Sequence, residues 1–365
     1  MTTIYADNAA TTQMSRAAID AMLPYMETIY GNPSSLHSVG QQAAEALLSA
    51  RDRIAKCLNA SPREIYFTSG GSEADNQAII SAARLGERKG KKHIISTAFE
   101  HHAMLHTLQK LEKEGFTVEL LPVGPIGTVT AQQVKDAIRE DTCLVSVMYA
   151  NNEIGSILPI AEIGAVCREK GVLFHTDAVQ AAGHLHINVN EQNIDMLSLS
   201  GHKFHGPKGT GVLYARQGIP LTNIIEGGAQ ERGKRAGTEN VPGIMGLAAA
   251  LKDACDHIDE NAGSDALFLT SDSHLTPVFA LAGRRILCGS GSYVYYHGMD
   301  YADEYNAMRT LYETPDTVTL QIWGVQYAVF DSSVYSRFAD ANEEWYAQRY
   351  PLWYENGGCR VYKIL

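Results

Sequence analysis

Apolar runs of four to seven residues alternate with amphipathic stretches over the first 258 residues of this 365-residue chain. Such runs, rich in Val, Ile, Leu and Phe, are typical of buried strands, and apolar residues at every third or fourth position are typical of helices. We expect strands at 64–68, 93–96, 117–122, 143–149, 171–176 and 195–200. We expect helices at 15–29, 38–59, from about 73, 102–114, 131–139, 160–170 and 241–258. The alternation predicts an α/β fold, in which right-handed crossovers build a mostly parallel sheet flanked by helices.

Two of these strands run into polar residues that suit one cofactor chemistry. Asp177 follows the strand at 171–176 and Lys203 follows the strand at 195–200, and carboxyl ends of such strands share a crevice. A lysine amine forms a Schiff base with an aldehyde, and a carboxylate keeps the ring nitrogen of pyridoxal phosphate protonated. Three neighbours could bind the ring hydroxyl (Gln180) or the phosphate (Ser200 and His202). The alternative is a surface lysine and a buried, strand-ending aspartate without a joint role.

A turn of small residues at 69–72 joins the strand at 64–68 to the helix that begins near Glu73. Small residues leave backbone amides free, and the helix dipole adds positive potential at this end. The turn is therefore a candidate phosphate cradle. Glycine-rich turns are common, so the turn alone does not identify a ligand.

The composition restricts the classes of partner. The chain is 45% hydrophobic and 19% charged, as ordinary globular proteins are, and its length allows two or three domains. Its net charge of −11, without a compensating basic block, argues against nucleic acid. We see no signal peptide and no apolar run near the ~20 residues that span a bilayer, so we expect a cytoplasmic protein without a membrane partner. The six cysteines are scattered without CxxC spacing, which favours reduced thiols over a metal site.

Eight phrases between residues 5 and 240 carry a resemblance to a known family. In order and spacing they resemble the cysteine desulfurases of the class V, pyridoxal-phosphate-dependent aminotransferase superfamily. The resemblance covers residues 1 to about 258 and implies the type I fold of pyridoxal-phosphate-dependent transferases. The phrases are YADNAATT (5–12), YGNPSSLHSVG (30–40), FTSGGSEADN (67–76), FEHHAM (99–104), YANNEIG (149–155), HTDAVQ (175–180), SGHKFHGPKG (200–209) and RAGTEN (235–240).

The resemblance implies catalytic roles for Lys203, Asp177 and His101. Lys203 would carry pyridoxal 5'-phosphate and then act as a base, while Asp177 would hold the pyridine nitrogen protonated. His101 would stack on the ring and relay protons, although a histidine at a helix start is otherwise a cap or core residue. Gly71 and Ser72 would contact the cofactor phosphate.

Two further residues are implied to complete the site. Asn152 is expected to end the strand at 143–149 within NNEIG and would bond the cofactor ring oxygen and the substrate carboxylate, although an asparagine in such a turn is otherwise a turn former. Thr238 lies in the glycine-rich, basic loop at 226–240 and would bind the phosphate of a neighbouring subunit. We therefore expect a homodimer with two composite sites, with a solvated basic loop as the alternative.

The composition changes past residue 262, where the resemblance to desulfurases ends. The family's cysteine loop and its substrate-binding arginine are not matched there. Twelve of the 18 tyrosines and all three tryptophans lie in this part. We expect two domains, 1–262 and 263–365, the second a separate small α/β unit that replaces the usual small domain. Its strands are expected near 266–270, 285–288, 326–331 and 360–364, and its helices near 302–313 and 342–349.

The second part resembles the C-terminal soluble domain of bacterial polytopic membrane glycosyltransferases. The phrases are LTSDSHLTPVFALAGRRILCGSGSYVYYHGMDY (269–301), WGVQYAVFDSSVYSR (323–337) and YPLWYENGGCRVYKIL (350–365). Because the two resemblances belong to different compartments, we interpret the chain as a chimera joined near Gly263, with a natural fusion as the alternative. Cys288 lies in a glycine- and serine-rich turn, but the residue order differs from a sulfur-accepting loop, and we expect structural thiols at Cys288 and Cys359.

Together these interpretations predict a cysteine desulfurase that is impaired because its cysteine loop is missing. The family converts L-cysteine to L-alanine and enzyme-bound sulfur, which supplies iron–sulfur cluster assembly through a sulfur-accepting scaffold protein. Two alternatives stay open: a non-catalytic fusion protein, and another class V activity such as selenocysteine lyase or aminotransferase.

Overall fold

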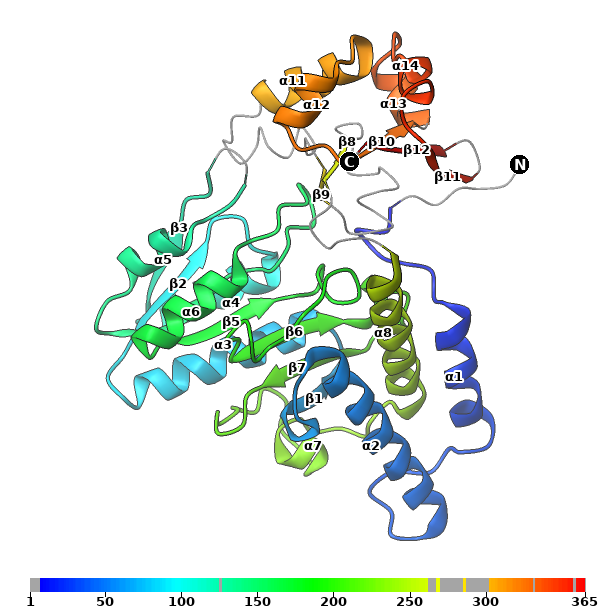
Figure 1. The fold of residues 1–365 in the computed structure, drawn as a ribbon. Helices are drawn as coiled ribbons and strands as arrows, with labels where there is room; N and C mark the ends of the chain where they lie inside the picture. Colours follow the sequence, from blue (N-terminus) through cyan, green and yellow to red (C-terminus); the bar gives the residue numbers. More distant parts are fainter. Residues whose placement is uncertain are drawn as a thin grey trace.

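Two separate β-sheets organise the chain (Figure 1). The computed structural model describes residues 7–124, 127–261, 267–269, 285–286, 302–330, 332–356 and 359–364. Residues up to the end of α8 (Val241–Asn261) build a seven-stranded sheet with its helices. The residues beyond α8 build a five-stranded sheet.

The seven-stranded sheet is mixed but mostly parallel, as the sequence predicts. Parallel pairing runs without interruption from β6 through β5, β4 and β2 to β3. β7 runs antiparallel to both of its neighbours, β6 and β1, and it was not among the expected strands. In spatial order the strands are β1 (Ile65–Thr68), β7 (Gly211–Ala215), β6 (Met196–Ser200), β5 (Leu173–Asp177), β4 (Thr142–Ser146), β2 (His93–Thr97) and β3 (Thr117–Leu121).

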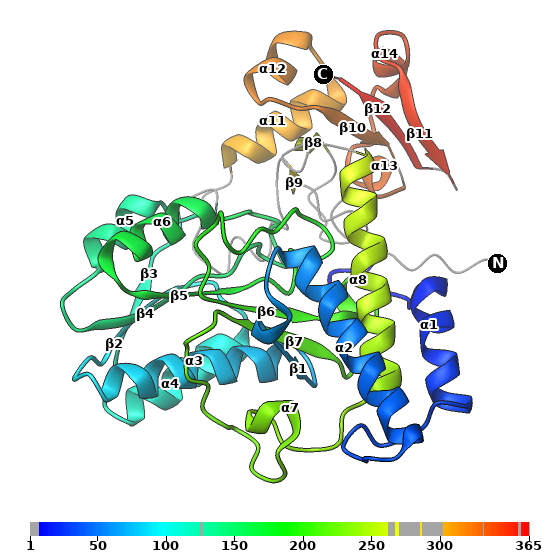
Figure 2. The same cartoon turned by 60° about the horizontal axis from the view of Figure 1, so that its bottom comes forward.

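Helices cover both faces of this sheet because alternate strand residues are apolar on both sides. On one strand, Leu197 packs in the core beneath α2 (Ser38–Leu58) and α8, while its neighbour Met196 packs in the opposite core. Figure 2 shows α8 between α1 (Arg16–Glu27) and α2, on one side of the sheet. The same core includes residues of α5 (Ala131–Ala137) and α6 (Ile160–Lys170). The opposite face is covered by α3 (Gly71–Glu87) and α4 (His102–Lys113).

Alanines let α3 lie close against the sheet. Ala74, Ala78 and Ala82 recur every four residues, so they share one face of the helix, and all three are fully buried. The helix crosses beneath the central strands, and its first residue, Gly71, directly follows the short turn after β1. Its N-terminus is therefore fixed at the carboxyl end of the sheet.

Several element boundaries differ from the expectations. The fourth strand ends at Ser146 rather than 149, although the Tyr149 amide still donates to the Asp177 carbonyl at 2.8 Å. The helix expected from about 73 begins at Gly71, and the last helix continues to Asn261. Two short 3₁₀ turns, η1 (Pro62–Glu64) and η2 (Gly201–Lys203), were not expected. None of the described helices has a stretch both long and apolar enough to cross a bilayer.

The second sheet encloses its own aromatic core. Tyr312 stacks on Phe338 at 5.1 Å between ring centroids and meets the Phe330 ring edge-on at 5.3 Å. The Tyr312 and Tyr346 hydroxyls donate to backbone carbonyls at 2.7 and 2.8 Å, so these buried polar groups are satisfied. The strands, in spatial order, are β11 (Leu352–Asn356), β12 (Cys359–Lys363), β10 (Tyr327–Phe330), β8 (Leu267–Leu269) and β9 (Arg285–Ile286).

The helices of this second unit are only partly those that the sequence predicts. The expected helices correspond to α11 (Ala302–Glu313) and to α14 (Glu343–Ala347), which is shorter at both ends. The unexpected elements are α12 (Thr317–Ile322), α13 (Ser332–Arg337) and the edge strand β11. The outer ends of the strands expected near 266–270 and 285–288 lie outside the described residues.

A buried ion pair ties the loop at 226–240 to the larger sheet. Arg51 of α2 donates to both carboxylate oxygens of Glu231, at 2.7 and 2.9 Å, and the two side chains are 10% and 2% exposed. Arg51 also donates to the Ile65 carbonyl, and Glu231 accepts from the Phe67 amide at 2.9 Å. Glu231 lies in the short helix α7 (Gln230–Gly233) with a left-handed φ of 47°. The pair therefore holds a strained turn against β1.

We predict that Arg51→Met lowers the free energy of unfolding of the larger unit by about 3–5 kcal/mol, because it leaves the Glu231 carboxylate buried without its cation. Urea unfolding followed by circular dichroism measures this change. Arg16→Met breaks the exposed Arg16–Asp20 pair and is the matched control, expected to change nothing measurable.

All three tryptophans lie beyond residue 262, so their fluorescence reports on the second unit alone. If the two units unfold independently, Arg51→Met leaves the fluorescence transition in place while it shifts the dichroism transition. A common shift of both signals contradicts independent unfolding.

Candidate active site

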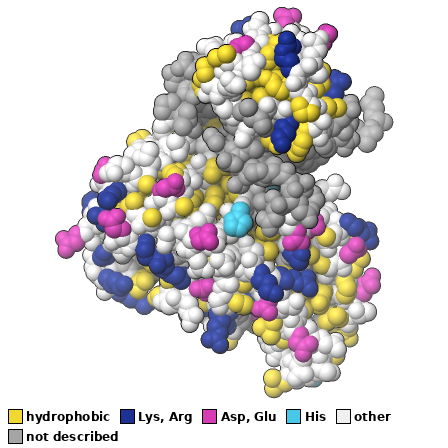
Figure 3. Space-filling view, in the orientation of Figure 1, with side chains coloured by type: hydrophobic (Ala, Val, Ile, Leu, Met, Phe, Trp, Pro, Cys, Tyr) yellow, Lys and Arg dark blue, Asp and Glu magenta, His cyan; other side chains and the backbone are white. Residues whose placement is uncertain are grey.

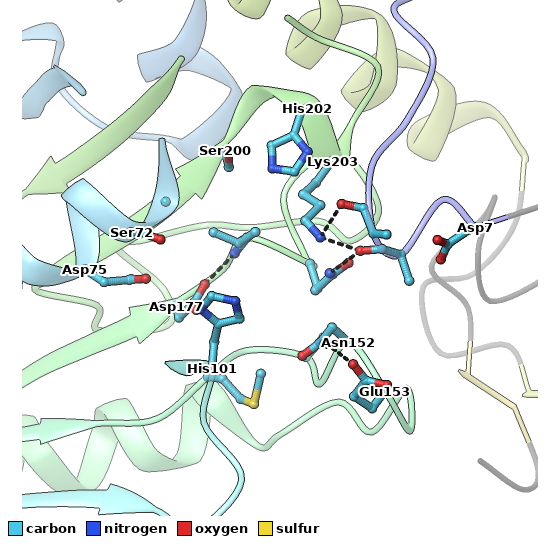
Figure 4. A pocket seen from close by; sticks show the side chains of 17 residues that line it. Asp7, Ser72, Asp75, His101, Asn152, Glu153, Asp177, Ser200, His202 and Lys203 are labelled. Carbon is cyan, nitrogen blue, oxygen red and sulfur yellow. Dashed lines mark hydrogen bonds between the residues drawn. The ribbon is translucent and has the colours of Figure 1, made fainter. Parts of the chain in front are cut away.

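The carboxyl ends of the parallel strands meet around one cavity of about 350 Å³ (Figure 4). Segments that follow β2, β4, β5 and β6 line this cavity, and so does the first turn of α3. A short N-terminal segment that includes Asp7, Ala9 and Ala10 closes another side. This position is the usual ligand site of an open α/β sheet.

The cavity brings together nine of the ten residues that the sequence analysis singled out. They are Gly71, Ser72, His101, Asn152, Asp177, Gln180, Ser200, His202 and Lys203. The tenth, Thr238, is exposed and does not line the cavity. Sequence reasoning gave no role to several other lining residues, although each lies within or beside a matched phrase. They are Asp7, Asp75, Met148, Glu153 and Val179.

Lys203 extends into the cavity from the 3₁₀ turn that follows β6. Its Nζ donates to the Ala9 carbonyl and, at 3.1 Å, to the Ala10 carbonyl, which Figure 4 shows as dashed lines. Burial lowers the pKa of Lys203, while the charges of Asp177, Asp7 and Glu153 oppose this shift. A buried amine with a lowered pKa is neutral more often at neutral pH, which suits a nucleophile.

Asp177 ends β5 and is only 5% exposed. Its Oδ1 accepts a hydrogen bond of 2.9 Å from the Val179 amide, which fixes the carboxylate within the turn that follows. Burial raises the pKa of Asp177, although this amide and the charges of His101 and Lys203 work against the shift. Asp177 forms no ion pair among the described residues, and a protonated ring nitrogen would supply a partner.

The first turn of α3 forms a cradle beside Ser200. A Cβ added to Gly71 would lie 2.5 Å from Cγ2 of Val179 and 3.6 Å from Cβ of Ser200, so a larger residue would fill this space. Ser72 follows with an exposed side chain. Free backbone amides and the positive end of a 17-residue helix face this space, as in an anion site.

His101 and Asn152 line the opposite side of the cavity. The imidazole Nδ1 of His101 accepts from the Ala103 amide at 3.1 Å and so caps α4, while Figure 4 shows the ring beside Asp177. The expectation that Asn152 directly ends a strand was wrong, because β4 stops at Ser146 and Asn152 lies in the turn beyond it. Its amide donates to Glu153 Oε1 at 2.7 Å.

Gln180 and His202 hold the N-terminal segment at the mouth of the cavity. The Gln180 amide donates to the Ala9 carbonyl at 3.0 Å, and His202 Nδ1 lies 3.1 Å from the Thr11 hydroxyl. Burial lowers the pKa of His202 to about 4, and the charges of two nearby lysines add to the shift. His202 is therefore neutral at neutral pH.

Two further carboxyl groups are buried behind Asp177. Glu100 Oε1 accepts from the Met148 amide at 2.9 Å and from the Thr97 hydroxyl at 2.5 Å, and burial raises its pKa to about 8. Burial also raises the pKa of Asp75 well above the usual range, and the charge of Asp177 adds to this. Neither carboxyl has a lysine or arginine partner within its described surroundings, so both are stabilised in the protonated form.

The imidazole of His175 completes this buried layer. It lies between the hydroxyls of Ser146 and Ser198, at 2.8 and 3.0 Å, and burial lowers its pKa to about 3. Burial therefore favours the uncharged form of each group in this layer. No group of three or more His, Cys, Asp or Glu residues within the described ranges is arranged to hold a metal ion.

The residues present fit a small aromatic ring that carries an aldehyde, a basic ring nitrogen and a phosphate. The lysine amine, the carboxylate without a close cation and the amide cradle each match one of these groups. The volume is also within the range of small-ligand sites.

Comparison with known proteins identifies the family. The family model for class V aminotransferases matches residues 4–264. The chain belongs to this family. Membership implies pyridoxal phosphate as the cofactor, in agreement with the chemistry of the cavity. The match stops at the boundary where the composition changes, and the remainder of the chain lies outside it.

Curated relatives are cysteine desulfurases. Cysteine desulfurase IscS of Clostridium botulinum is 54% identical over 257 residues, which cover 70% of this chain and 64% of that protein. A putative cysteine desulfurase IscS 1 of Bacillus subtilis is 51% identical over 260 residues, which cover 71% and 68%. The chain thus spans about two thirds of the length of the relatives that it matches.

Solved structures give the same result for the fold. A NifS-like protein is 41% identical with a TM-score of 0.69, and the alignment covers 71% of each chain. A structure titled SspA in complex with cysteine is 43% identical with a TM-score of 0.66, over 68% of this chain and 72% of that one. These matches support the mostly parallel α/β sheet of pyridoxal-phosphate enzymes for the larger unit.

We predict that Glu100→Gln becomes progressively more stable relative to the natural protein as the pH rises from about 5 to 8. The folded pKa is raised to about 8, so the folded state holds a proton that the unfolded chain releases from about pH 4.5. The free energy of unfolding of the natural protein therefore falls by up to about 1.4 kcal/mol per pH unit in this window. The Glu100→Gln variant, whose amide does not titrate, lacks this loss.

Urea unfolding at a series of pH values measures this difference. Glu112→Gln removes an exposed carboxylate from α4 and is the matched control. A difference between Glu100→Gln and the natural protein that stays constant with pH would show that Glu100 is charged in the folded state.

Proposed function

We propose that the larger unit binds pyridoxal phosphate on Lys203 and accepts L-cysteine in the manner of a cysteine desulfurase. The observation that carries this proposal is the convergence of a half-buried lysine, a buried aspartate and a helix N-terminus on one cavity. When bound, the cofactor supplies an aldehyde for amines and a ring that withdraws electrons from the α-carbon of the substrate.

Lys203 has two roles in this proposal. Its amine attaches the cofactor and, when the substrate amine replaces it there, takes the proton from the substrate α-carbon. Both roles need a neutral amine, and the buried position that lowers its pKa supports them. The Ala9 and Ala10 carbonyls orient Nζ before the reaction.

Asp177 and His101 act on the two sides of the ring in this proposal. Asp177 holds a proton on the pyridine nitrogen, because a buried carboxylate without a close cation strongly favours a positive partner. His101 stacks on the ring and moves protons at its exposed imidazole edge. Its position beside Asp177 and at the mouth of the cavity supports this role.

The remaining residues would orient the cofactor and the substrate. Gly71 and Ser72 bind the phosphate with backbone amides, Ser200 and His202 add side-chain contacts, and Gln180 binds the ring hydroxyl. Asn152 binds the ring oxygen and the substrate carboxylate. In each case the support is the placement of the residue on the cavity wall together with the resemblance to the family.

We further propose that the protein acts as a homodimer. Thr238 is exposed and lies away from the cavity of its own subunit, so it is free to reach the phosphate of a second copy. The Arg51–Glu231 pair fixes the start of the loop that carries it. The same proposal places the protein in the cytoplasm, where thiols stay reduced. It also includes a scaffold protein that accepts the sulfur.

The sulfur-accepting step is where this chain departs from its relatives. Among the described residues, none of the four cysteines, which form no disulfide, lines the cavity. Cys143 and Cys167 are buried, and burial raises their pKa values to about 11 and about 12. Cys288 lies outside the described residues, and so does the side chain of Cys359. We therefore infer that cysteine binds but that sulfur transfer is impaired.

We propose that residues 263–365 are foreign to the desulfurase unit. Their sheet has its own aromatic core, and the family match ends at residue 264. The similarity of their phrases to the soluble domain of membrane glycosyltransferases supports a chimeric origin. The second candidate function, a non-catalytic fusion protein, is favoured by the same observation.

The attachment of the cofactor tests the proposal directly. We predict that borohydride reduction after incubation with pyridoxal phosphate fixes the label on the peptide that contains Lys203. Mass spectrometry of the digest locates the label. Lys203→Ala abolishes it, while Lys208→Ala, which changes an exposed lysine five residues away, retains it. Label on Lys208 in the natural protein would refute the assignment.

We also predict that the protein loaded with cofactor releases sulfide from L-cysteine at close to the rate of free pyridoxal phosphate. Sulfur transfer needs a thiolate held within bonding distance of the substrate sulfur on a mobile loop. Sulfide assays compare the natural protein with Cys288→Ser and Cys359→Ser, which are expected to change little. Rapid sulfide release that disappears in Cys288→Ser would show that the second unit does supply the sulfur acceptor.

A further inference from the structure

A second cavity, of about 730 Å³, lies between helices α2 and α8 and shares no residue with the active-site cavity. Two cysteines line it, Cys57 from the last turn of α2 and Cys255 from α8. The segment 185–187 forms another wall. No local pattern of residues indicates this pair, because the two cysteines are 198 positions apart.

The two thiols are neighbours in the fold. Both are half-buried and pack against the main core, and neither forms a disulfide in this structure. A hydrogen bond with the Cys255 thiol lowers the pKa of Cys57, while burial and the charge of Asp256 work in the opposite direction. The pair is thus in contact and reaches the cavity, unlike the deeply buried Cys143 and Cys167.

Basic side chains surround this pair. Arg53 and Lys56 reach the cavity from α2, and Lys252 reaches it from α8, where it pairs with Asp256. Among the described residues, Arg53 and Lys56 form no ion pair with a carboxylate, so their charges are available to a ligand. The chain as a whole is acidic, so this group of cations beside two thiols contrasts with its surroundings. Figure 3 shows acidic and basic side chains interspersed over the visible face of the larger unit.

We propose that Cys57 and Cys255 form a dithiol site that reacts with anionic low-molecular-weight disulfides and closes to an intramolecular disulfide. The cations bind the carboxylates of the disulfide and place its sulfur beside Cys57. The Cys57 thiolate attacks that sulfur, a Cys57 mixed disulfide forms, and one small thiolate leaves. The Cys255 thiolate then attacks Cys57 sulfur and releases the second small thiolate.

The exchange is balanced. The protein loses two thiol protons and two electrons, and the small disulfide gains both and becomes two small thiols. The new bond would join the end of α2 to α8, the last helix of the larger unit. It would close a loop of almost 200 residues, which includes the active-site strands, and would restrict the unfolded chain.

Oxidised glutathione, which is anionic, tests the site in the reduced full-length protein, with cationic cystamine as the matched probe. Peptide mapping without reductant is expected to show Cys57 joined to Cys255. Cys255→Ser is expected to stop at one glutathione adduct on Cys57, while Cys143→Ser and Cys167→Ser retain the Cys57–Cys255 bond. We expect oxidised glutathione to react about tenfold faster than cystamine at low salt, a ratio that falls as salt rises.

Either of two results would overturn the proposal. The first is that Cys57 and Cys255 can still be alkylated separately after oxidation, or that they form disulfides with other cysteines. Peptide mapping of the natural protein detects either outcome without any variant. The second is that oxidised glutathione and cystamine react at the same rate, which would show that the site does not favour anionic disulfides. Arg53→Gln together with Lys56→Gln is expected to equalise the rates, and an unchanged ratio in this variant would show that these cations do not bind the disulfide.

Discussion

The parallel pairing of β5 with β6 is the constraint on which the candidate active site depends. Asp177 lies opposite Ser198 in that pairing, so the carboxylate that ends one strand and the lysine that follows the next reach the same cavity. Both are charged groups removed from water, and each is costly without the other or a ligand. The helices on both faces keep this edge of the sheet rigid, and the short N-terminal segment closes it.

The cavity is supported by a layer of polar groups that the core keeps neutral. His175 is held by two serines, Glu100 holds the Met148 amide, and Asp75 lies behind Asp177. Because burial favours the uncharged form of the other groups in this layer, the Asp177 carboxylate dominates the electrostatic field on this side of the cavity. That field acts on any ligand bound in the cavity. The same layer links the turn after β2 to the segment after β4, where His101 and Asn152 lie.

The chain joins the candidate site of the larger unit to a second unit that lies outside the family match. The family match, the compositional change and the separate aromatic core place the boundary at the same point, near residue 262. The chemistry divides in the same way. The groups that we propose to bind a cofactor and activate a substrate lie in the larger unit, whereas no cysteine thiol is among the described residues of the cavity.

The sequence by itself indicated the parallel strands and nine residues that line the cavity, because strand-ending polar residues and matched phrases are local signals. It missed β7 and the elements α12, α13 and β11, and it placed Asn152 at the end of a strand that stops earlier. Only the tertiary structure brought Cys57 to Cys255, and only burial raised the pKa values of Glu100 and Asp75 behind the site. Contacts across long separations, and the loss of water around a side chain, are decided by packing, which no local pattern of residues records.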